Sequence, residues 1–550
     1  MSLIPFRKNF FSTLNENKYL YPFLLLACCI FYFVYTFKNY DLIPNDDYVY
    51  MNFGAYLSLP LTDNYAGFFY PLFFRLLFFL SGFKAILTDV YLAYYFISVG
   101  CFLCLYAYLK RLRISSSVSI LTSVVFLFSD YQILIIPKIS CFCLLLILFT
   151  VQFIQQKERF IRLFGITILC WVLSYTRPEF FISFLLAFLS LVIFFIHTQR
   201  YKDYSQVILL LLPAALLMFG IIFLGGQPIT NRGLDAFKQH FIINYQNWFP
   251  NVVLDKKTGS EFLLFDKVFG KVKSTLDIFL VNPSFFLRHI FTNILTYFKL
   301  SFKLLYGIWF SPIQTVFGIY NKYVIIGSGL LMVFLTDFKA TFSRIKSSFI
   351  YFGAKEGFTI LLVLLPTFIA VILIYPREHY FLFHLIIYLP AIAIILENLI
   401  FRKIRLSIPL GLSFSMILLI SVINKTKWMN YSTTKNLKMY EYMLQISREE
   451  HSSMMSNDLF TPLLFKENVE KYHYFNSQFP KNQLITNQKD VNNFLKVNSV
   501  NIIFLNLDAI DKTNQPLLEF IESRYLTYGF EKITDYQPLN CVIFRKKNPQ

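Results

Sequence analysis

Long apolar runs separated by short polar connections repeat along most of the chain. Each run is close to the roughly 17–25 residues with which a helix crosses a bilayer. We expect about eleven spans, near residues 20–37, 90–109, 117–135, 139–156, 162–176, 180–197, 206–225, 321–337, 357–375, 380–398 and 406–423. The pattern predicts an α-helical polytopic membrane protein.

Two segments depart from this pattern. The connection at 226–320 contains an apolar stretch at 285–310, which we interpret as an amphipathic or re-entrant segment at the outer surface. Counting it as a span would reverse the side of every later connection. After residue 425 the sequence resembles that of a soluble protein, with helices expected at 435–450 and 516–528 and strands at 500–505 and 541–545. We therefore expect a transmembrane domain over 1–425, with outer loops at 38–67 and 226–320, and a small α/β domain over 426–550.

The composition agrees with a membrane location. Of the 550 residues, 56% are hydrophobic and only 15% are charged, too few to cover a soluble protein of this length. The net charge of +19 comes from Lys and Arg in short connections, without a basic stripe, so we expect no nucleic-acid partner. The basic connections at 110–113, 157–162, 200–202, 339–346 and 402–405 share one side if the N-terminus is cytoplasmic. The loop at 38–67 and the C-terminal domain are then extracytoplasmic.

Acidic and basic residues gather on the predicted outer side. Asp46 and Asp47 follow the first span, and an acidic pair beside a bilayer suggests an active site; the alternative is that they only solvate a loop. Arg177 lies in the sequence Thr-Arg-Pro-Glu at 176–179, and Arg377 lies in Pro-Arg-Glu at 376–378. Proline favours the first helical turn, and a helix N-terminus beside an arginine suits a phosphate.

Further donors lie close to these helix starts. His379, Tyr380 and His384 follow the second start, and Lys138 adds a charge from the turn at 135–139. The alternative interpretation is that the arginines extend to the lipid headgroups and the neighbouring glutamates favour the helix dipoles. If the cations do face a substrate, carboxylates on one loop and cations at two helix starts suit group transfer from a lipid phosphate. The carboxylate takes a proton from the acceptor while the cations stabilise the departing phosphate.

These motifs resemble those of a known family. Asp-Asp-Tyr-Val-Tyr at 46–50, followed by Tyr-Pro-Leu at 70–72, resembles the Asp-Glu-x-x-Tyr loop and downstream Pro-Leu of the GT-C membrane glycosyltransferases. These include protein O-mannosyltransferases and aminoarabinose transferases that use polyprenyl-phosphate sugars. Residues 173–180 resemble the basic end of their fifth span, and 377–390 resemble their late Arg-x-x-Tyr…Pro segment. The sequence differs by having Asp at 47 instead of the commoner Glu, which leaves the donor sugar open.

The resemblance implies a catalytic role for Asp46, with Asp47 as the following acidic residue, and donor-phosphate contacts for Arg177 and Arg377. We add His379, Tyr380 and Lys138 to the expected phosphate site. The predicted function is transfer of a sugar from a polyprenyl-phosphate donor, with inversion, to a lipid, glycan or protein acceptor outside a bacterial plasma membrane. No cofactor is expected, with a divalent cation at the acidic pair as the alternative left open.

Two other functions remain as alternatives. A transporter or flippase for lipid-linked intermediates would use the same charges to line a path, although it would favour charges through the membrane depth and related halves. An O-antigen ligase or polymerase-like enzyme would use diphosphate-linked donors and a large outer loop, for which 227–320 is long enough. Membrane lipids are expected partners in all three cases.

Overall fold

The computed structural model describes part of the chain, in two compact units. The described residues are 19–38, 50–51, 53–54, 67–81, 86–133, 138–153, 158–224, 232–251, 260–317, 335–343, 346, 356–398, 400–401, 404–405, 452–456, 469–474, 495, 499–507, 522–536 and 541–547. The first unit comprises Met1–Lys38, Ser58–Tyr70 and Tyr94–Trp428, and the second comprises Asn39–Leu57, Pro71–Ala93 and Met429–Gln550. The expected division into 1–425 and 426–550 stays a prediction, because the second unit also takes in two segments from the N-terminal part.

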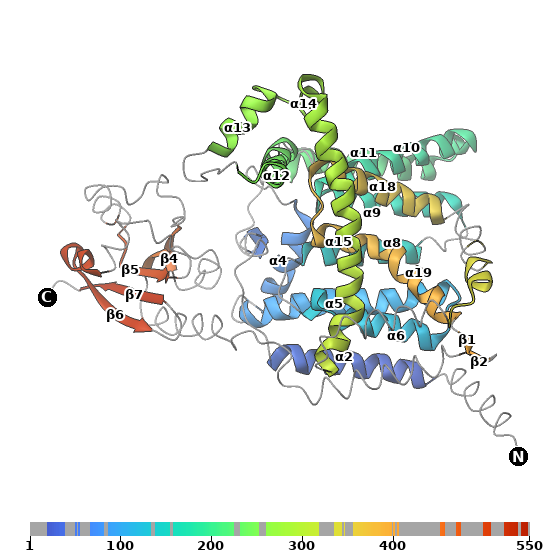
Figure 1. The fold of residues 1–550 in the computed structure, drawn as a ribbon, viewed down its shortest axis with the longest axis horizontal. Helices are drawn as coiled ribbons and strands as arrows, with labels where there is room; N and C mark the ends of the chain where they lie inside the picture. The colour runs from blue at the N-terminus through green and yellow to red at the C-terminus, as the bar shows by residue number, and fades with distance from the viewer. Residues whose placement is uncertain are drawn as a thin grey trace, which may run out of the picture. The chain divides into compact units, whose positions relative to one another are not determined.

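The described structure is mostly helical, as the apolar runs predict (Figure 1). The helices are α2 (Leu20–Lys38), α4 (Phe69–Ser81), α5 (Ile86–Arg111), α6 (Ser116–Leu127), α7 (Asp130–Ile133), α8 (Ile139–Phe153), α9 (Arg159–Ser174), α10 (Phe181–His197), α11 (Tyr204–Phe223), α12 (Arg232–Trp248), α13 (Ser260–Phe269), α14 (Thr275–Val281), α15 (Pro283–Phe317), α18 (Glu356–Ile374) and α19 (Leu385–Glu397). Short 3₁₀ helices precede α10, α11 and α19: η1 (Pro178–Phe180), η2 (Arg200–Lys202) and η4 (Glu378–His384).

Among the described residues, four helical segments are long and apolar enough to cross a membrane. They are Asp89–Arg111, Pro178–His197, Tyr204–Phe223 and Tyr380–Glu397, and the pair α14 and α15, bent by 119°, would make a fifth if it were one span. Shorter apolar helices occupy Leu20–Val34, Phe69–Ser81, Ser116–Leu127, Ile139–Val151 and Val363–Ile374. Expected spans at 321–337 and 406–423 lie almost wholly or wholly outside the described residues. The expected count of about eleven is therefore not confirmed, whereas several long apolar helices fit a membrane protein.

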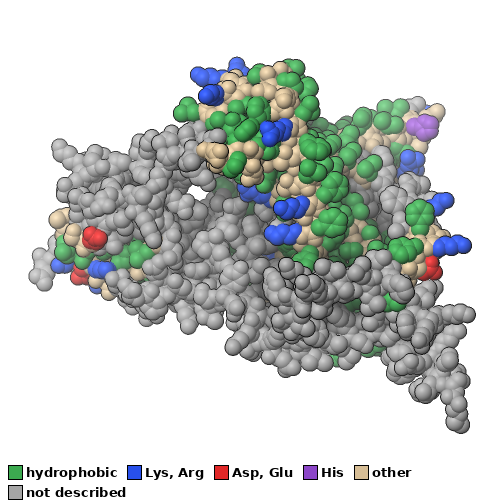
Figure 2. All heavy atoms as spheres, in the orientation of Figure 1, with side chains coloured by type: hydrophobic (Ala, Val, Ile, Leu, Met, Phe, Trp, Pro, Cys, Tyr) green, Lys and Arg blue, Asp and Glu red, His purple; other side chains and the backbone are tan. Residues whose placement is uncertain are grey.

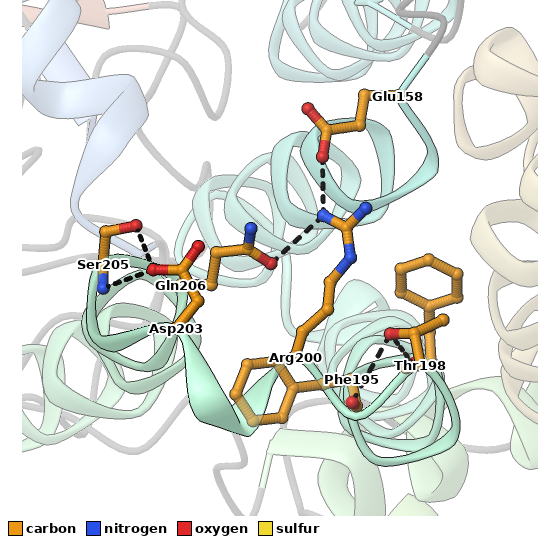
Figure 3. Close-up of polar contacts among 8 residues, drawn as sticks. Glu158, Phe195, Thr198, Arg200, Asp203, Ser205 and Gln206 are labelled. Atoms are coloured by element: carbon orange, nitrogen blue, oxygen red, sulfur yellow. Dashed lines mark hydrogen bonds and ion pairs between the residues drawn. The ribbon is translucent and has the colours of Figure 1, made fainter.

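Basic side chains join helix ends within the first unit. Arg200 donates to Glu158 at 2.6 Å and to Gln206 at 3.1 Å, which ties the start of α9 to η2 and the start of α11 (Figure 3). Arg111 donates to the carbonyl of Val151 at 2.7 Å, so it caps the last turn of α8. These residues belong to the connections at 110–113, 157–162 and 200–202. Their cytoplasmic location stays a prediction.

Tyr175, just after α9, lies where three segments approach closely. A Cβ atom on Gly220 of α11 would overlap the Tyr175 ring. Gly67 lies against the Tyr175 carbonyl with a φ of +70°, a conformation that glycine adopts without strain. The Phe69 amide, at the start of α4, donates to that same carbonyl at 3.3 Å. The two glycines therefore allow α11 and the segment before α4 to pack against the end of α9.

Helix α15 crosses the other helices of the first unit. In Figure 1 it runs steeply across α8, α9, α18 and α19. Several of its contacts are with helix ends: His289 reaches the last carbonyls of α18, and Gly307 packs against the ring of Tyr131 in α7. Its 35 residues make a helix about 50 Å long, longer than the roughly 30 Å hydrocarbon core of a bilayer. These features fit the surface segment expected at 285–310 better than a span.

An aromatic cluster supports the start of α15. Helices α12, α13 and α14 share a buried core made by Phe237, Phe241, Phe265, Phe269 and Ile278. Ser274 and Asp277 form a capping box at the start of α14, which satisfies two free amides of that helix. The expected outer loop at 226–320 therefore contains ordered helices over most of its length.

The C-terminal part of the second unit forms a five-stranded mixed sheet. Its strands are β3 (Ser452–Ser456), β4 (Val469–Tyr474), β5 (Ile502–Asn506), β6 (Phe530–Tyr536) and β7 (Cys541–Lys546), in the order β4-β3-β5-β7-β6. Strands β5 and β7 match the expected strands at 500–505 and 541–545. The described end of the expected helix at 516–528 is a 3₁₀ turn, η6 (Arg524–Tyr528). The expected helix at 435–450 lies outside the described residues.

Candidate functional site

The predicted catalytic pair, Asp46 and Asp47, lies outside the described residues. The backbone of His379 is described within η4, but its side chain is not. The positions that can be compared with the expected site are therefore Lys138, Arg177, Arg377 and Tyr380.

Tyr380 lies beside both expected arginines. The guanidinium carbon of Arg177 is 4.7 Å from the centre of the Tyr380 ring, and that of Arg377 is 5.9 Å from the same point. Both distances are in the range of cation–π contacts. Residues 200 positions apart in the sequence thus share one aromatic ring.

The two arginines differ in how they are held. The Arg177 side chain is only 11% exposed; it donates to Ser140 at 3.0 Å and forms a 2.8 Å ion pair with Glu179. Arg377 is exposed, and it forms no ion pair with any residue that the structure describes. Arg177 is therefore a fixed cation, whereas Arg377 can reach a ligand from solvent.

Four helix starts lie around Arg177. The hydrogen bond to Ser140 connects Arg177 to the first turn of α8, and Arg177 itself directly precedes η1 and α10. The contact with Tyr380 connects it to η4 and α19. The start of α4 is near as well, because Tyr70 packs against Phe142 of α8 with 5.3 Å between ring centres. Helix N-termini carry partial positive charge, and the Glu179 carboxylate, which is ion-paired with Arg177, is an acidic group among these starts.

Lys138 has a different environment from the one expected. It is 1% exposed, and its ammonium group donates to the carbonyls of Tyr131 at 3.2 Å and Gln132 at 2.9 Å. These carbonyls belong to α7, so Lys138 holds the end of α7 beside the start of α8. Lys138 thus places a buried positive charge directly before the start of α8.

His384 belongs to a buried hydrogen-bonded network rather than to an exposed set of donors. It is 3% exposed, and its ring nitrogens pair with the hydroxyls of Tyr297 at 3.0 Å and Thr367 at 3.2 Å. The Thr367 hydroxyl already donates to the carbonyl of Leu364 at 2.7 Å. The imidazole of His384 must therefore donate from Nε2 to the Thr367 oxygen, and its Nδ1 accepts from the Tyr297 hydroxyl. The network joins α15, α18 and α19 directly behind the segment that carries Arg377 and Tyr380.

A second buried group holds the end of α18. His289 and Asn293 of α15 are fully buried and reach the carbonyls of Ile374 at 3.0 Å and Ile372 at 2.7 Å. Asn244 of α12 donates to Asn293 at 2.8 Å. The last carbonyls of a helix have no hydrogen-bond partner within that helix. His289 and Asn293 supply partners for the last carbonyls of α18, directly before the segment 375–377 that carries Arg377. Polar residues at 289, 293, 297 and 301, each four apart, are the signal in the sequence from which this buried group could have been predicted.

His240 is a further residue near Arg377 that the sequence analysis did not identify. It is 4% exposed, stacks on Tyr375 with 5.1 Å between ring centres, and donates from Nδ1 to the carbonyl of Ala236 at 2.6 Å. Burial lowers the pKa of its imidazole, and the charge of Arg377 acts in the same direction. The ring is therefore neutral at physiological pH, and it leaves Arg377 as the cation of this segment.

The arrangement as a whole suits an anionic ligand with an apolar tail. Arg377 is exposed, Arg177 and Tyr380 hold its surroundings, and several helix starts add positive potential. Among the described residues, no three His, Cys, Asp or Glu side chains come together as a metal site would require. No protein-family model matches this sequence, and no curated protein matches it.

Proposed function

We propose that the protein is an integral-membrane glycosyltransferase that takes a sugar from a polyprenyl-phosphate donor. The observation that carries this proposal is the shared contact of Arg177 and Arg377 with Tyr380, among converging helix starts. A lipid phosphate would lie against Arg377, the exposed cation, with its tail between the apolar helices. Charge-assisted bonds from a guanidinium to phosphate oxygens are among the stronger hydrogen bonds in proteins.

In this proposal each residue has a separate task. Arg377 binds the phosphate, with His379 as an additional donor, and Arg177 and Tyr380 fix its position. Lys138, being buried, contributes only through its charge. Asp46 takes the proton from the acceptor hydroxyl as that oxygen attacks the anomeric carbon, and Asp47 assists it. The bond from the sugar to the phosphate breaks, and the growing negative charge on the phosphate is stabilised by Arg377. Direct attack of this kind inverts the anomeric centre.

Phosphate binding can be measured without knowing the sugar. Farnesyl phosphate, a short lipid phosphate, serves as the probe for purified protein in detergent. Losing a hydrogen bond to a charged group costs about 1.5–3 kcal/mol, so Arg377→Gln should weaken binding of this probe about 10- to 150-fold. Arg200→Gln is the matched control, since Arg200 joins the helix ends away from Tyr380. Equal binding by the Arg377→Gln and Arg200→Gln variants would defeat the proposed site.

Sugar transfer is tested separately in liposomes with a panel of labelled polyprenyl-phosphate sugars and a membrane extract as acceptor. Asp46→Asn should abolish transfer while leaving farnesyl phosphate binding unchanged. Transfer at the wild-type rate by this variant would remove Asp46 as the base. Movement of the labelled donor between leaflets without any transfer would instead favour the flippase alternative.

A further inference from the structure

The first two thirds of helix α15 have a buried face of polar side chains and an exposed face rich in large apolar side chains. The buried face carries His289, Asn293, Tyr297 and Ser301 at steps of four residues. The outward face carries five large apolar side chains, each at least half exposed: Leu287, Phe291, Leu295, Phe298 and Phe302. A helix at a water-facing surface normally has the opposite arrangement. An apolar surface must therefore cover this face.

Cations are interleaved with the exposed apolar residues. Arg288, Lys299 and Lys303 are exposed on α15, and the sequence of this helix has no Asp or Glu. Figure 2 shows hydrophobic and basic side chains together along α15 and over the adjoining helices α13 and α14. Helix α14 extends the apolar surface with Leu276 and Leu280. The charges on α15 are thus all basic and lie beside apolar side chains, which matches acyl chains beneath anionic headgroups, and Asp277 at the start of α14 is the acidic residue of the adjoining helix.

The positions of the lysines favour one orientation of the helix. Residue 300 is the midpoint of α15, so Lys299 and Lys303 lie at its centre. If α15 crossed the bilayer, both ammonium groups would lie near the middle of the hydrocarbon core, where charges are costly. If α15 lies along the membrane surface, both lysines reach the headgroups while the neighbouring Phe side chains enter the acyl region. The contacts of α15 with the ends of α18 and α7 agree with the second orientation.

We propose that α14 and α15 form a membrane-surface element that binds anionic lipid headgroups through Arg288, Lys299 and Lys303. Its partner is the surface of the bilayer in which the protein resides. The buried face of the same helix holds the end of α18, so the element connects the lipid surface to the segment that carries Arg377. This proposal does not depend on glycosyl transfer and would hold for any function of the protein.

The orientation can be tested with spin labels on the full chain. Single cysteines at positions 291, 295 and 302 are labelled in lipid nanodiscs, with Cys29 and Cys104, the two native cysteines that are not fully buried, replaced by alanine. Depth is measured from the relaxation caused by oxygen and by a water-soluble nickel complex. A surface-lying helix places all three labels at similar depth. A spanning helix separates positions 291 and 302 by about 16 Å, and such a depth gradient would overturn the proposal.

Lipid selectivity tests the role of the cations. Spin-labelled phosphatidylglycerol and phosphatidylcholine are compared for the fraction that the wild-type protein immobilises. Each lysine near an anionic surface contributes about a fivefold preference, so the double variant Lys299→Gln, Lys303→Gln should lose most of the preference for phosphatidylglycerol. Lys202→Gln, an exposed lysine in η2, is the matched control. A double variant with wild-type selectivity, or a control with an equal loss, would overturn the headgroup contact.

Discussion

Replacing Asn293 by leucine should test whether α15 holds the end of α18. Asn293 is fully buried, donates to the carbonyl of Ile372 at 2.7 Å, and accepts from Asn244 at 2.8 Å. Leucine has the same branched arrangement of side-chain heavy atoms, so the substitution leaves no large cavity. It removes both of these hydrogen bonds and also the contacts of Asn293 with His289 at 3.0 Å and with the carbonyl of Ile374 at 3.3 Å. What remains is one carbonyl at the end of α18 and one N–H of Asn244 that have each lost a partner.

The size of the effect follows from these two groups. A buried polar group without a partner costs about 1–3 kcal/mol, so losing the partners of two such groups should lower the free energy of unfolding by about 2–6 kcal/mol. His289 still contacts the carbonyl of Ile374 at 3.0 Å in the variant. We therefore expect a loss of unfolding free energy near the lower end of this range. Hydrogen bonds between helices inside a bilayer average only about 0.6 kcal/mol. A loss above about 2 kcal/mol would therefore show that this end of α18 is shielded from both water and alternative partners.

The assay uses the cysteines of the chain as reporters. None of the eight forms a disulfide, and six of them are buried, so a thiol-reactive dye labels the protein mainly when it unfolds. Unfolding is followed in mixed micelles with increasing SDS content, which gives a free energy for each variant. Leu295→Ala is the control, because Leu295 lies two residues away on the exposed face of α15. If Asn293→Leu is no less stable than this control, the side chain does not hold α18 and our account of the network is wrong.

Two further predictions concern close packing and pH. Gly220→Ala should destabilise the protein in the same assay, because a Cβ atom at this position would overlap the Tyr175 ring. Gly165→Ala is the control, since a Cβ atom at position 165 meets nothing within 4 Å. Equal losses of stability in the two variants would contradict the close approach of α9 and α11. Because the pKa of His240 is lowered in the folded protein, the unfolded chain takes up a proton at this imidazole at a higher pH than the folded protein does. The free energy of unfolding should therefore decrease as the pH falls below 6.5, the pKa of the imidazole in the unfolded chain. Comparing unfolding at about pH 7.5 and about pH 5.5, we expect a smaller loss in His240→Gln than in the wild type, and an identical loss would remove His240 as a contributor.

The sequence predicted well those features that depend on neighbouring residues. Apolar runs gave the helices α2, α5, α8, α10, α11 and α18, because a bilayer requires a continuous apolar surface and internal backbone pairing. It also predicted strands β5 and β7, whose apolar residues are continuous. It did not predict β3, with the sequence Ser-Ser-Met-Met-Ser, because such a segment becomes a strand only through pairing with β4 and β5.

At the candidate site, the contact partners of the charged side chains could not be predicted from the sequence. Arg177 and Arg377 were both recognised from their places before helix starts, yet nothing in either local sequence indicates that they share the Tyr380 ring. Lys138 was expected to contact the phosphate, but its ammonium group donates to two carbonyls of α7, which the local sequence does not indicate. Charge type and approximate location are properties of the sequence; the partner of each charge is not.

The sequence by itself determined that the chain forms mostly helices, several of them long and apolar enough to fit a membrane protein, with unusual charges at a few helix ends. It could do so because hydropathy and helix-start preferences act over distances of one or two turns. Only the tertiary structure decided that α15 lies across the ends of other helices, that His289 and Asn293 supply partners to α18, and that two distant arginines meet at Tyr380. These contacts join residues some 80 to 200 positions apart, and they form only when packing brings the helices together.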